Sequence, residues 1–184
     1  GIGDLWDSGK QKSSNTVGVR YQGKKLTSSQ DVYWKVNVWT NNHKNIWSPS
    51  AHWSMGLLHF KDWKGRWIGM DSLAHGDKDE KFSKLSARYF RKTYQLTKPV
   101  KRAKAHIIGL GLYELFINGQ KVGDQVLAPA PTDYSKNVLY NTFDVTQMLQ
   151  YGNNTIGTIL GNGRYYTMRQ NYKPYKIKDF GYPK

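Results

Sequence analysis

Apolar and polar residues alternate most clearly on either side of an Asn-Gly pair in the second half of the chain. Tyr113, Leu115 and Ile117 fall on one face of a segment whose other positions carry Glu114 and Phe116. The pair Asn118-Gly119 follows directly, and these two residue types best tolerate the positive φ angles of a type I′ turn. Residues 109–123 are therefore predicted to form a β-hairpin.

Other segments with strand character follow at short intervals and predict an all-β domain. They are residues 88–96, 103–112, 115–117, 138–143 and 155–160, with Pro129 and Pro131 in the loop before Asp133. Asp144 or Thr146 is expected to cap one short helical turn that Gly152 ends. Because no long segment has helical periodicity, a β-sandwich or jelly roll is the expected fold class.

The N-terminal part carries a different strand pair. Residues 32–39 alternate, a polar turn is expected over 40–45, and residues 47–55 predict a returning strand that Pro49 restricts to an edge or a bend. This pattern resembles the last two strands of a fibronectin type III-like module, whose upstream strands we expect before Gly1. We place the boundary near Leu58, which gives residues 1–58 to this module and 59–184 to the second domain.

The composition is globular and strongly basic, with 38% hydrophobic residues and a formal net charge of +15. Nine basic residues and no acidic residue lie between Glu80 and Glu114. Such a run fits either a solvated lysine-rich face or a site for nucleic acid or another anion, and we favour the first. No cysteine is present, so the compartment stays open, with a periplasmic or extracellular location favoured. No segment predicts a membrane span or a signal peptide, and the chain is expected to be the interior of a longer one.

Catalytic and metal-binding groups are sparse. The chain has two glutamates, Glu80 in a charged loop and Glu114 inside a predicted strand, and neither is expected to be catalytic. Asp133, in a long loop, is the best remaining carboxylate, although a role in hydrogen-bonding its own turn is favoured. Asp77 and Asp79 lie two apart, but neighbouring lysines favour a solvated loop over a calcium site. We expect no catalytic residue, no metal and no cofactor.

The ordered series of motifs resembles the N-terminal jelly-roll domain of bacterial α-L-rhamnosidases of glycoside hydrolase family 78. The motifs are residues 87–92, 100–103, 109–123, 132–134, 138–146 and 160–163, and residues 4–10, 33–34 and 62–69 resemble the preceding fibronectin-like module and linker. The chain departs from the family at Arg164, where an aromatic residue is common, and at Pro131, where tryptophan is common.

This resemblance implies a fragment without catalytic activity, because catalysis in the family belongs to an (α/α)6 barrel further downstream. The expected partner is that barrel in the same polypeptide, and the whole enzyme would remove terminal rhamnose from a carbohydrate by inversion. The candidates for contact with carbohydrate or with the barrel are Asp133, Tyr134, Asn162, Arg164, Tyr165 and Tyr166. A basic nucleic-acid-binding module and a stand-alone carbohydrate-binding or adhesion module remain the alternatives, although no nucleic-acid partner is expected.

Overall fold

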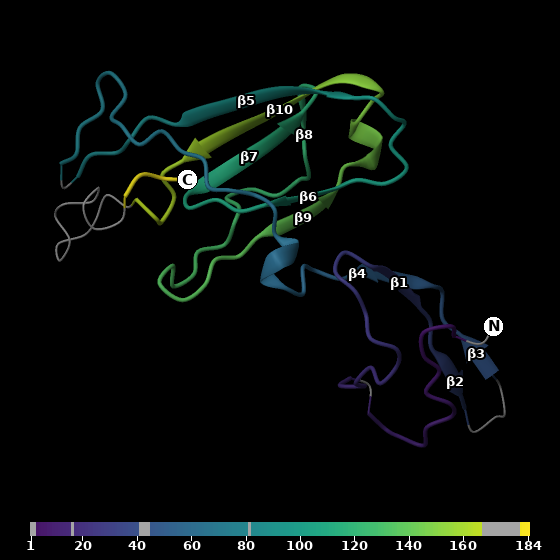
Figure 1. The fold of residues 1–184 in the computed structure, drawn as a ribbon. Coiled ribbons are helices and arrows are strands. Elements are labelled where there is room, and N and C mark those ends of the chain that lie inside the picture. The colour runs from purple at the N-terminus through teal and green to yellow at the C-terminus, as the bar shows by residue number, and fades with distance from the viewer. Residues whose placement is uncertain (1–2, 16, 41–44, 81, 167–180) are drawn as a thin grey trace. The chain divides into compact units, whose positions relative to one another are not determined.

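The computed structural model describes residues 3–15, 17–40, 45–80, 82–166 and 181–184. Backbone contacts divide the chain into two compact units, Gly1–Lys64 and Gly65–Lys184 (Figure 1). Residues 58–62 are tied to the first unit, because the Ser28 hydroxyl accepts a hydrogen bond from the Leu58 N–H at 2.8 Å and donates one to Asp62. The module boundary near Leu58 stays a prediction.

The first unit contains an interrupted hairpin. β1 (Asp31–Trp34) pairs antiparallel with β4 (Ala51–Ser54), and β2 (Asn37–Trp39) pairs with β3 (Asn45–Trp47). The expected continuous strands over 32–39 and 47–55 are therefore wrong, since each divides in two. Of the turn expected over 40–45, residues 41–44 lie outside the described residues.

Ser48 and Pro49 explain where the hairpin is interrupted. Two residues of the outgoing strand, 35 and 36, lie opposite three of the returning strand, 48–50, between the pairs Trp34↔Ala51 and Asn37↔Trp47. Ser48 replaces the missing strand pairing with two hydrogen bonds to Val36. Its hydroxyl accepts from the Val36 N–H at 2.9 Å, and its own N–H donates to the Val36 carbonyl at 2.8 Å. Pro49 has no N–H to donate, so a regular ladder cannot pass through it.

The second unit is an antiparallel β-sandwich, as the sequence predicted. Its larger sheet has the strand order β5 (Arg88–Leu96), β10 (Gly152–Gly161), β7 (Leu112–Ile117) and β8 (Gln120–Lys121). The second layer pairs β6 (Lys104–Ile107) with β9 (Asn141–Asp144). Figure 1 shows this pair beside the larger sheet within the second unit. Two 3-10 turns complete the elements, η1 (Phe60–Asp62) in the first unit and η2 (Thr146–Met148) in the second.

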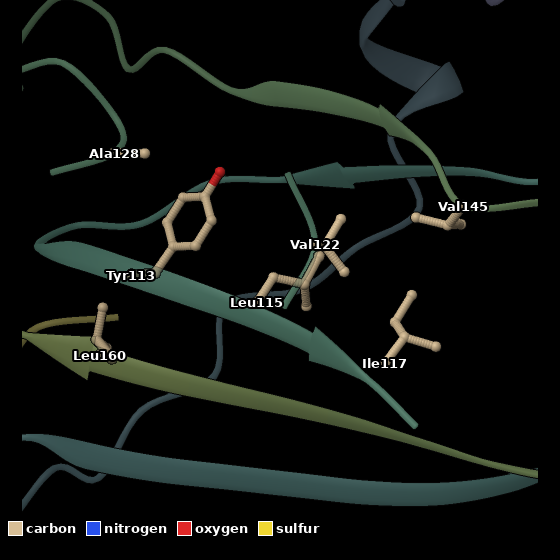
Figure 2. Close-up of a cluster of buried hydrophobic side chains, with 7 residues drawn as sticks. All are labelled: Tyr113, Leu115, Ile117, Val122, Ala128, Val145 and Leu160. Carbon is tan, nitrogen blue, oxygen red and sulfur yellow. The ribbon is translucent and has the colours of Figure 1, made fainter. Parts of the chain in front are cut away.

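The core lies between these two layers (Figure 2). Tyr113, Leu115 and Ile117 point into it from β7, as their alternation predicted, and all three are buried. The cluster is completed by Val122, Ala128, Val145 and Leu160, with partly buried side chains from β5, β6 and β9 packed against it. Burying one such aliphatic side chain contributes about 1.5–3 kcal/mol, so this cluster is the main stabilising feature of the unit.

Some strands differ in length from the prediction. β5 has the bounds expected from the sequence, whereas β6 ends at Ile107 instead of continuing to Leu112. Between the end of β6 and Leu112 the chain passes from the smaller sheet to the larger one. Gly111 lies in this crossing with a φ of 139°, and a Cβ there would overlap the Gly161 carbonyl oxygen, so a larger residue would not fit. β10 starts at Gly152 rather than near Thr155 because Asn153 and Asn154 already pair with β5.

The hairpin turn has the expected geometry. Asn118 and Gly119 have φ angles of 50° and 82°, as a type I′ turn requires, and Ile117 pairs with Gln120. The Asn118 side chain also accepts a hydrogen bond from the Thr155 N–H and donates one to the Asn154 side chain, each at 2.9 Å. The turn is thus attached to β10 as well as to its own strands. Among the described residues, no helix is long and apolar enough to cross a membrane.

Replacing Gly119 with valine should destabilise the second unit by about 1–3 kcal/mol, because a β-branched residue is strained at this φ. A Cβ at Gly119 has no atom within 4 Å, so the loss would come from the backbone conformation and not from a clash. Equilibrium urea denaturation followed by circular dichroism measures it. Gly119→Asn is the control and should cost clearly less, since asparagine tolerates left-handed φ angles. Equal stability of the valine variant and the unchanged chain would contradict this account of the turn.

Candidate contact site at one end of the second unit

Several candidate residues meet at the end of the sandwich where β10 finishes and β7 begins. The rings of Tyr134 and Tyr165 pack edge to face with centroids 5.3 Å apart. Gly181 lies beside Tyr165, because a Cβ on Gly181 would be 3.9 Å from the Tyr165 hydroxyl oxygen. Next to them Lys184 and Leu110 exchange two backbone hydrogen bonds, of 2.6 and 3.2 Å. Residues far apart in the sequence therefore form this end of the unit.

Two cations lie near the tyrosine pair. Burial raises the pKa of Tyr134, and the positive charge of Arg164 opposes that rise. Burial likewise raises the pKa of Tyr165, with Lys184 opposing it. Both phenols therefore stay protonated at neutral pH, beside an exposed guanidinium. Such a surface offers aromatic rings and hydrogen-bond donors, the groups that suit either a sugar or another protein surface.

Asp133 makes its hydrogen bonds within its own turn. Its carboxylate accepts from the Ser135 hydroxyl at 2.6 Å and the Ser135 N–H at 3.1 Å, and it pairs with Lys136 at 3.2 Å. The hydrogen bond from the Ser135 hydroxyl is the largest of the effects that lower the pKa of this exposed carboxyl. Asp133 is thus a turn residue next to Tyr134, and its lowered pKa keeps it ionised at neutral pH.

Asn162 and Tyr166 point inward and hold the loop before β5. The Asn162 amide donates to the Leu85 carbonyl at 2.6 Å and accepts from the Leu85 N–H at 3.1 Å. Tyr166 is only 1% exposed, and its hydroxyl donates to Asp79 at 2.9 Å. Burial, followed by the hydrogen bond to Asp79, raises the pKa of Tyr166 to about 12. Within the candidate set, Tyr134, Tyr165 and Arg164 therefore lie beside one another within reach of solvent, with the exposed Asp133 next to Tyr134.

A buried ion pair was missed by the sequence analysis. Arg88 and Asp77 pair at 2.8 Å, with side chains only 6% and 3% exposed. Burial disfavours the charged form of Asp77, but hydrogen bonds from Ser86, Arg88 and Ala74 outweigh it and hold the pKa of Asp77 well below its usual range. The sequence feature that could have indicated this ion pair is the position of Arg88 two residues before Phe90. Residues two apart on a strand share a face, and Phe90 packs against the core.

Both glutamates of the chain are paired with a lysine. Glu114 pairs with Lys121 at 2.6 Å across the hairpin, and Glu80 lies 3.7 Å from Lys78 on the surface. Within the described ranges, no three His, Asp or Glu side chains form a group that could hold a metal ion. His43 and Lys81 lie outside those ranges.

The basic residues of β5 do not share one face of the sheet. Arg88 is used in the buried ion pair, whereas Arg91, opposite Gly157, and Lys92, opposite Ile156, are exposed. Consecutive side chains of a strand point to opposite faces. The three positive charges of β5 are thereby divided between a buried ion pair and the two faces of the strand.

Comparison with known proteins decides the family. A family model described as "Alpha-L-rhamnosidase N-terminal domain" matches residues 98–183, and one described as "Rha78A-like, N-terminal immunoglobulin domain" matches residues 1–59. An α-L-rhamnosidase of Formosa agariphila is 38% identical over 177 residues, covering 88% of this chain and 19% of the relative. The chain belongs to the α-L-rhamnosidase family. One from an Alteromonas species is 35% identical, covering 88% of this chain and 18% of the relative.

Solved rhamnosidase structures share the fold. The α-L-rhamnosidase from Dictyoglumus thermophilum superimposes with a TM-score of 0.77 at 40% identity, over 89% of this chain and 19% of that one. The enzyme from Aspergillus terreus gives a TM-score of 0.75 at 30% identity, over 94% of this chain and 20% of that one. The chain thus corresponds to the N-terminal domains of rhamnosidases and spans about a fifth of the length of these relatives.

Asp77→Asn should destabilise the second unit by about 3–5 kcal/mol, because it leaves Arg88 charged, buried and unpaired. The folded-state pKa of Asp77 is lowered, so its contribution is complete above the unfolded value of about 3.9 and disappears only as the pH falls through the lower folded value. Urea denaturation of both proteins at several pH values should give a constant difference between pH 5 and 7 that shrinks in strong acid.

Glu80→Gln is the matched control in the same loop. Its carboxylate is 67% exposed and pairs with the similarly exposed Lys78, so its removal should leave stability nearly unchanged. If Asp77→Asn behaves like this control, the buried ion pair does not anchor the loop.

Proposed function

We propose that this chain is the non-catalytic N-terminal part of an enzyme that hydrolyses terminal α-L-rhamnosides, and that it packs against and orients the catalytic (α/α)6 barrel of the same polypeptide. The observation that carries the proposal is the coverage of the matches. Relatives named α-L-rhamnosidase align with 88% of this chain while the alignment covers only 19% of their length. The catalytic region would then lie in the remaining four-fifths.

The chemistry of the described residues supports a role without catalysis. Inverting glycosidases need two carboxyl groups about 6.5–9.5 Å apart, one of them protonated, on either side of the sugar. Here Asp77 is buried in an ion pair, Asp133 is ionised within its turn and Glu114 is paired with Lys121. None of these three carboxylates is set up as a protonated acid facing a second carboxylate across open space.

The tyrosine end of the second unit suits the proposed contact with the rest of the polypeptide. Tyr134, Tyr165 and Arg164 are close together there, and Lys184 is hydrogen-bonded beside them. Carbohydrate contact by the same rings is the second candidate, favoured by the aromatic pair and the adjacent guanidinium.

The chain of 184 residues should not hydrolyse an aryl α-L-rhamnoside above background, whereas the full-length polypeptide should release rhamnose with inverted anomeric configuration. Both proteins are assayed on the same substrate, and NMR identifies the first-formed anomer before it mutarotates. Activity of the shorter chain would mean that a catalytic carboxylate has been overlooked. An inactive full-length polypeptide would leave the fold standing and refute the rhamnosidase function.

Tyr165→Ala in the full-length polypeptide separates the two contact roles. A raised KM with unchanged kcat is the result expected for a sugar contact. A lower melting temperature with both constants unchanged is the result expected for packing between domains.

Nucleic acid should bind only weakly and without sequence preference, because the three basic residues of β5 are divided between a buried ion pair and the two faces of the strand. Binding by charge alone weakens with salt, at a slope of roughly −0.9 per duplex phosphate neutralised, and should vanish near physiological salt. Fluorescence anisotropy with labelled duplexes over a salt series measures it. A dissociation constant below about 0.1 µM at physiological salt, typical of dedicated binders, would favour the nucleic-acid alternative instead.

A further inference from the structure

The loop between β8 and Ala128 presents two neighbouring aliphatic side chains to solvent. Val126 is 77% exposed and Leu127 is 72% exposed. All of residues 123–127 are exposed, whereas Val122 and Ala128 on either side are buried in the core. We call Val126 and Leu127 the apolar tip. Single exposed aliphatic residues are common, but two adjacent ones at the end of a loop form a local apolar patch.

The loop is held firmly at both ends. The Val122 N–H donates to the Leu115 carbonyl at 2.8 Å, and the Tyr113 N–H donates to the Ala128 carbonyl at 2.9 Å, so both ends are fixed to β7. The middle is held through a polar relay, in which the Tyr113 hydroxyl donates to Asn141 at 2.6 Å and the Asn141 amide donates to Gln125 at 2.8 Å. The apolar tip is therefore presented by an ordered loop.

The backbone at the apolar tip is in an unfavourable conformation. Leu127 has a φ of 57°, a region that residues with a Cβ avoid and that glycine or asparagine adopts more easily. Conformations of this kind persist only where the surrounding structure enforces them, and they concentrate at contact sites. Leucine at this position gives the isolated unit no compensating burial, because its side chain lies in solvent. A contact that buries it would supply that compensation.

The base of the loop that carries the apolar tip is linked to the place where residue 184 is attached. Lys184 and Leu110 exchange two backbone hydrogen bonds, of 2.6 and 3.2 Å. Gly109, the neighbour of Leu110, lies against the base of the loop, since a Cβ on it would be 3.6 Å from Pro129 Cδ. In a polypeptide that continues past residue 184, as the fivefold longer relatives would, the next residues start on the side of the unit that includes the base of this loop.

We propose that Val126 and Leu127 dock into an apolar pocket on the part of the polypeptide that follows residue 184. The inference rests on the proposed function and names one surface through which the second unit would orient the catalytic domain. A tethered partner fits best, because linkage on one chain gives a high effective concentration and allows a small contact to hold. Two side chains provide far less than the roughly 1,200 Å² that a stable interface between separate molecules buries.

Hydrogen exchange measured by mass spectrometry tests the proposal on the 184-residue chain and on the full-length polypeptide. Peptides covering residues 122–131 should exchange at least about ten-fold more slowly in the full-length polypeptide, because docking closes the loop. The control is the peptide around Tyr151, which is 70% exposed just before β10, at the opposite end of that strand. Equal exchange of residues 122–131 in the two proteins would overturn the proposal.

Substitutions then separate docking from a structural role of the loop. Leu127→Asn should leave the melting temperature of the 184-residue chain unchanged or higher, because it relieves the strained backbone. In the full-length polypeptide, Leu127→Asn and Val126→Ser should each restore the fast exchange of residues 122–131, and Tyr151→Ser should not. A loop that served only the fold would show the same loss of stability in both proteins, which would contradict docking.

Light scattering and an activity assay separate docking within one polypeptide from self-association and from the proposed enzymatic function. Light scattering of the 184-residue chain should show a monomer, and a dimer that Val126→Ser abolishes would assign the apolar tip to a second copy instead. Rhamnoside hydrolysis by the full-length polypeptide reports on the proposed function separately. An active enzyme without protection of residues 122–131 refutes only the docking surface, and protection in an inactive polypeptide refutes only the enzymatic function.

Discussion

The second unit depends on the backbone ladder of β10. This strand is hydrogen-bonded along both edges, to β5 from Gly152 to Leu160 and to β7 from Ile156 to Gly161. A central strand satisfies all its backbone donors and acceptors only when both neighbours are in register. The three strands come from distant parts of the sequence, so their pairing closes long loops before the core is complete. The loops at either end of the unit take their positions from this strand.

Each end of β10 organises a different set of polar groups. Near its start, Asn154 and Thr155 bind the Asn118 side chain and so fix the hairpin turn. After its end, Asn162 and Tyr166 bind Leu85 and Asp79 in the loop that precedes β5. A buried hydrogen-bonding group left unpaired costs about 1–3 kcal/mol, so these side chains are constrained by the fold. The same constraint buries Tyr166 and commits the amide of the half-buried Asn162 to the backbone of Leu85.

The sequence predicted the features that depend on neighbours along the chain. Alternation gave the core face of β7, and the residue types at Asn118 and Gly119 gave the turn, because each signal lies within a few positions. Pro49 indicated an edge or a bend in the returning strand, but the hydrogen bond of Ser48 to Val36 joins residues twelve positions apart across the hairpin and could not be predicted from the pattern. The role of Asn162 depends on Leu85, which is 77 residues away. Polar side chains are ambiguous in sequence for this reason, since the same amide serves a ligand or a distant backbone group.

Exposed apolar residues carry different information from polar candidates. A polar side chain that reaches solvent is stable with or without a partner, so Arg164 on the surface says little about binding. Exposure of Val126 and Leu127 to water costs roughly 25 cal/mol for each Å² of apolar surface, relative to burial. Leu127 also has an unfavourable φ. Both penalties act on a loop that is fixed at its two ends and, through Gln125, in its middle. In a chain that spans about a fifth of its relatives' length, such exposed and strained apolar residues are therefore a stronger indication than surface polar residues of where the remaining polypeptide makes contact.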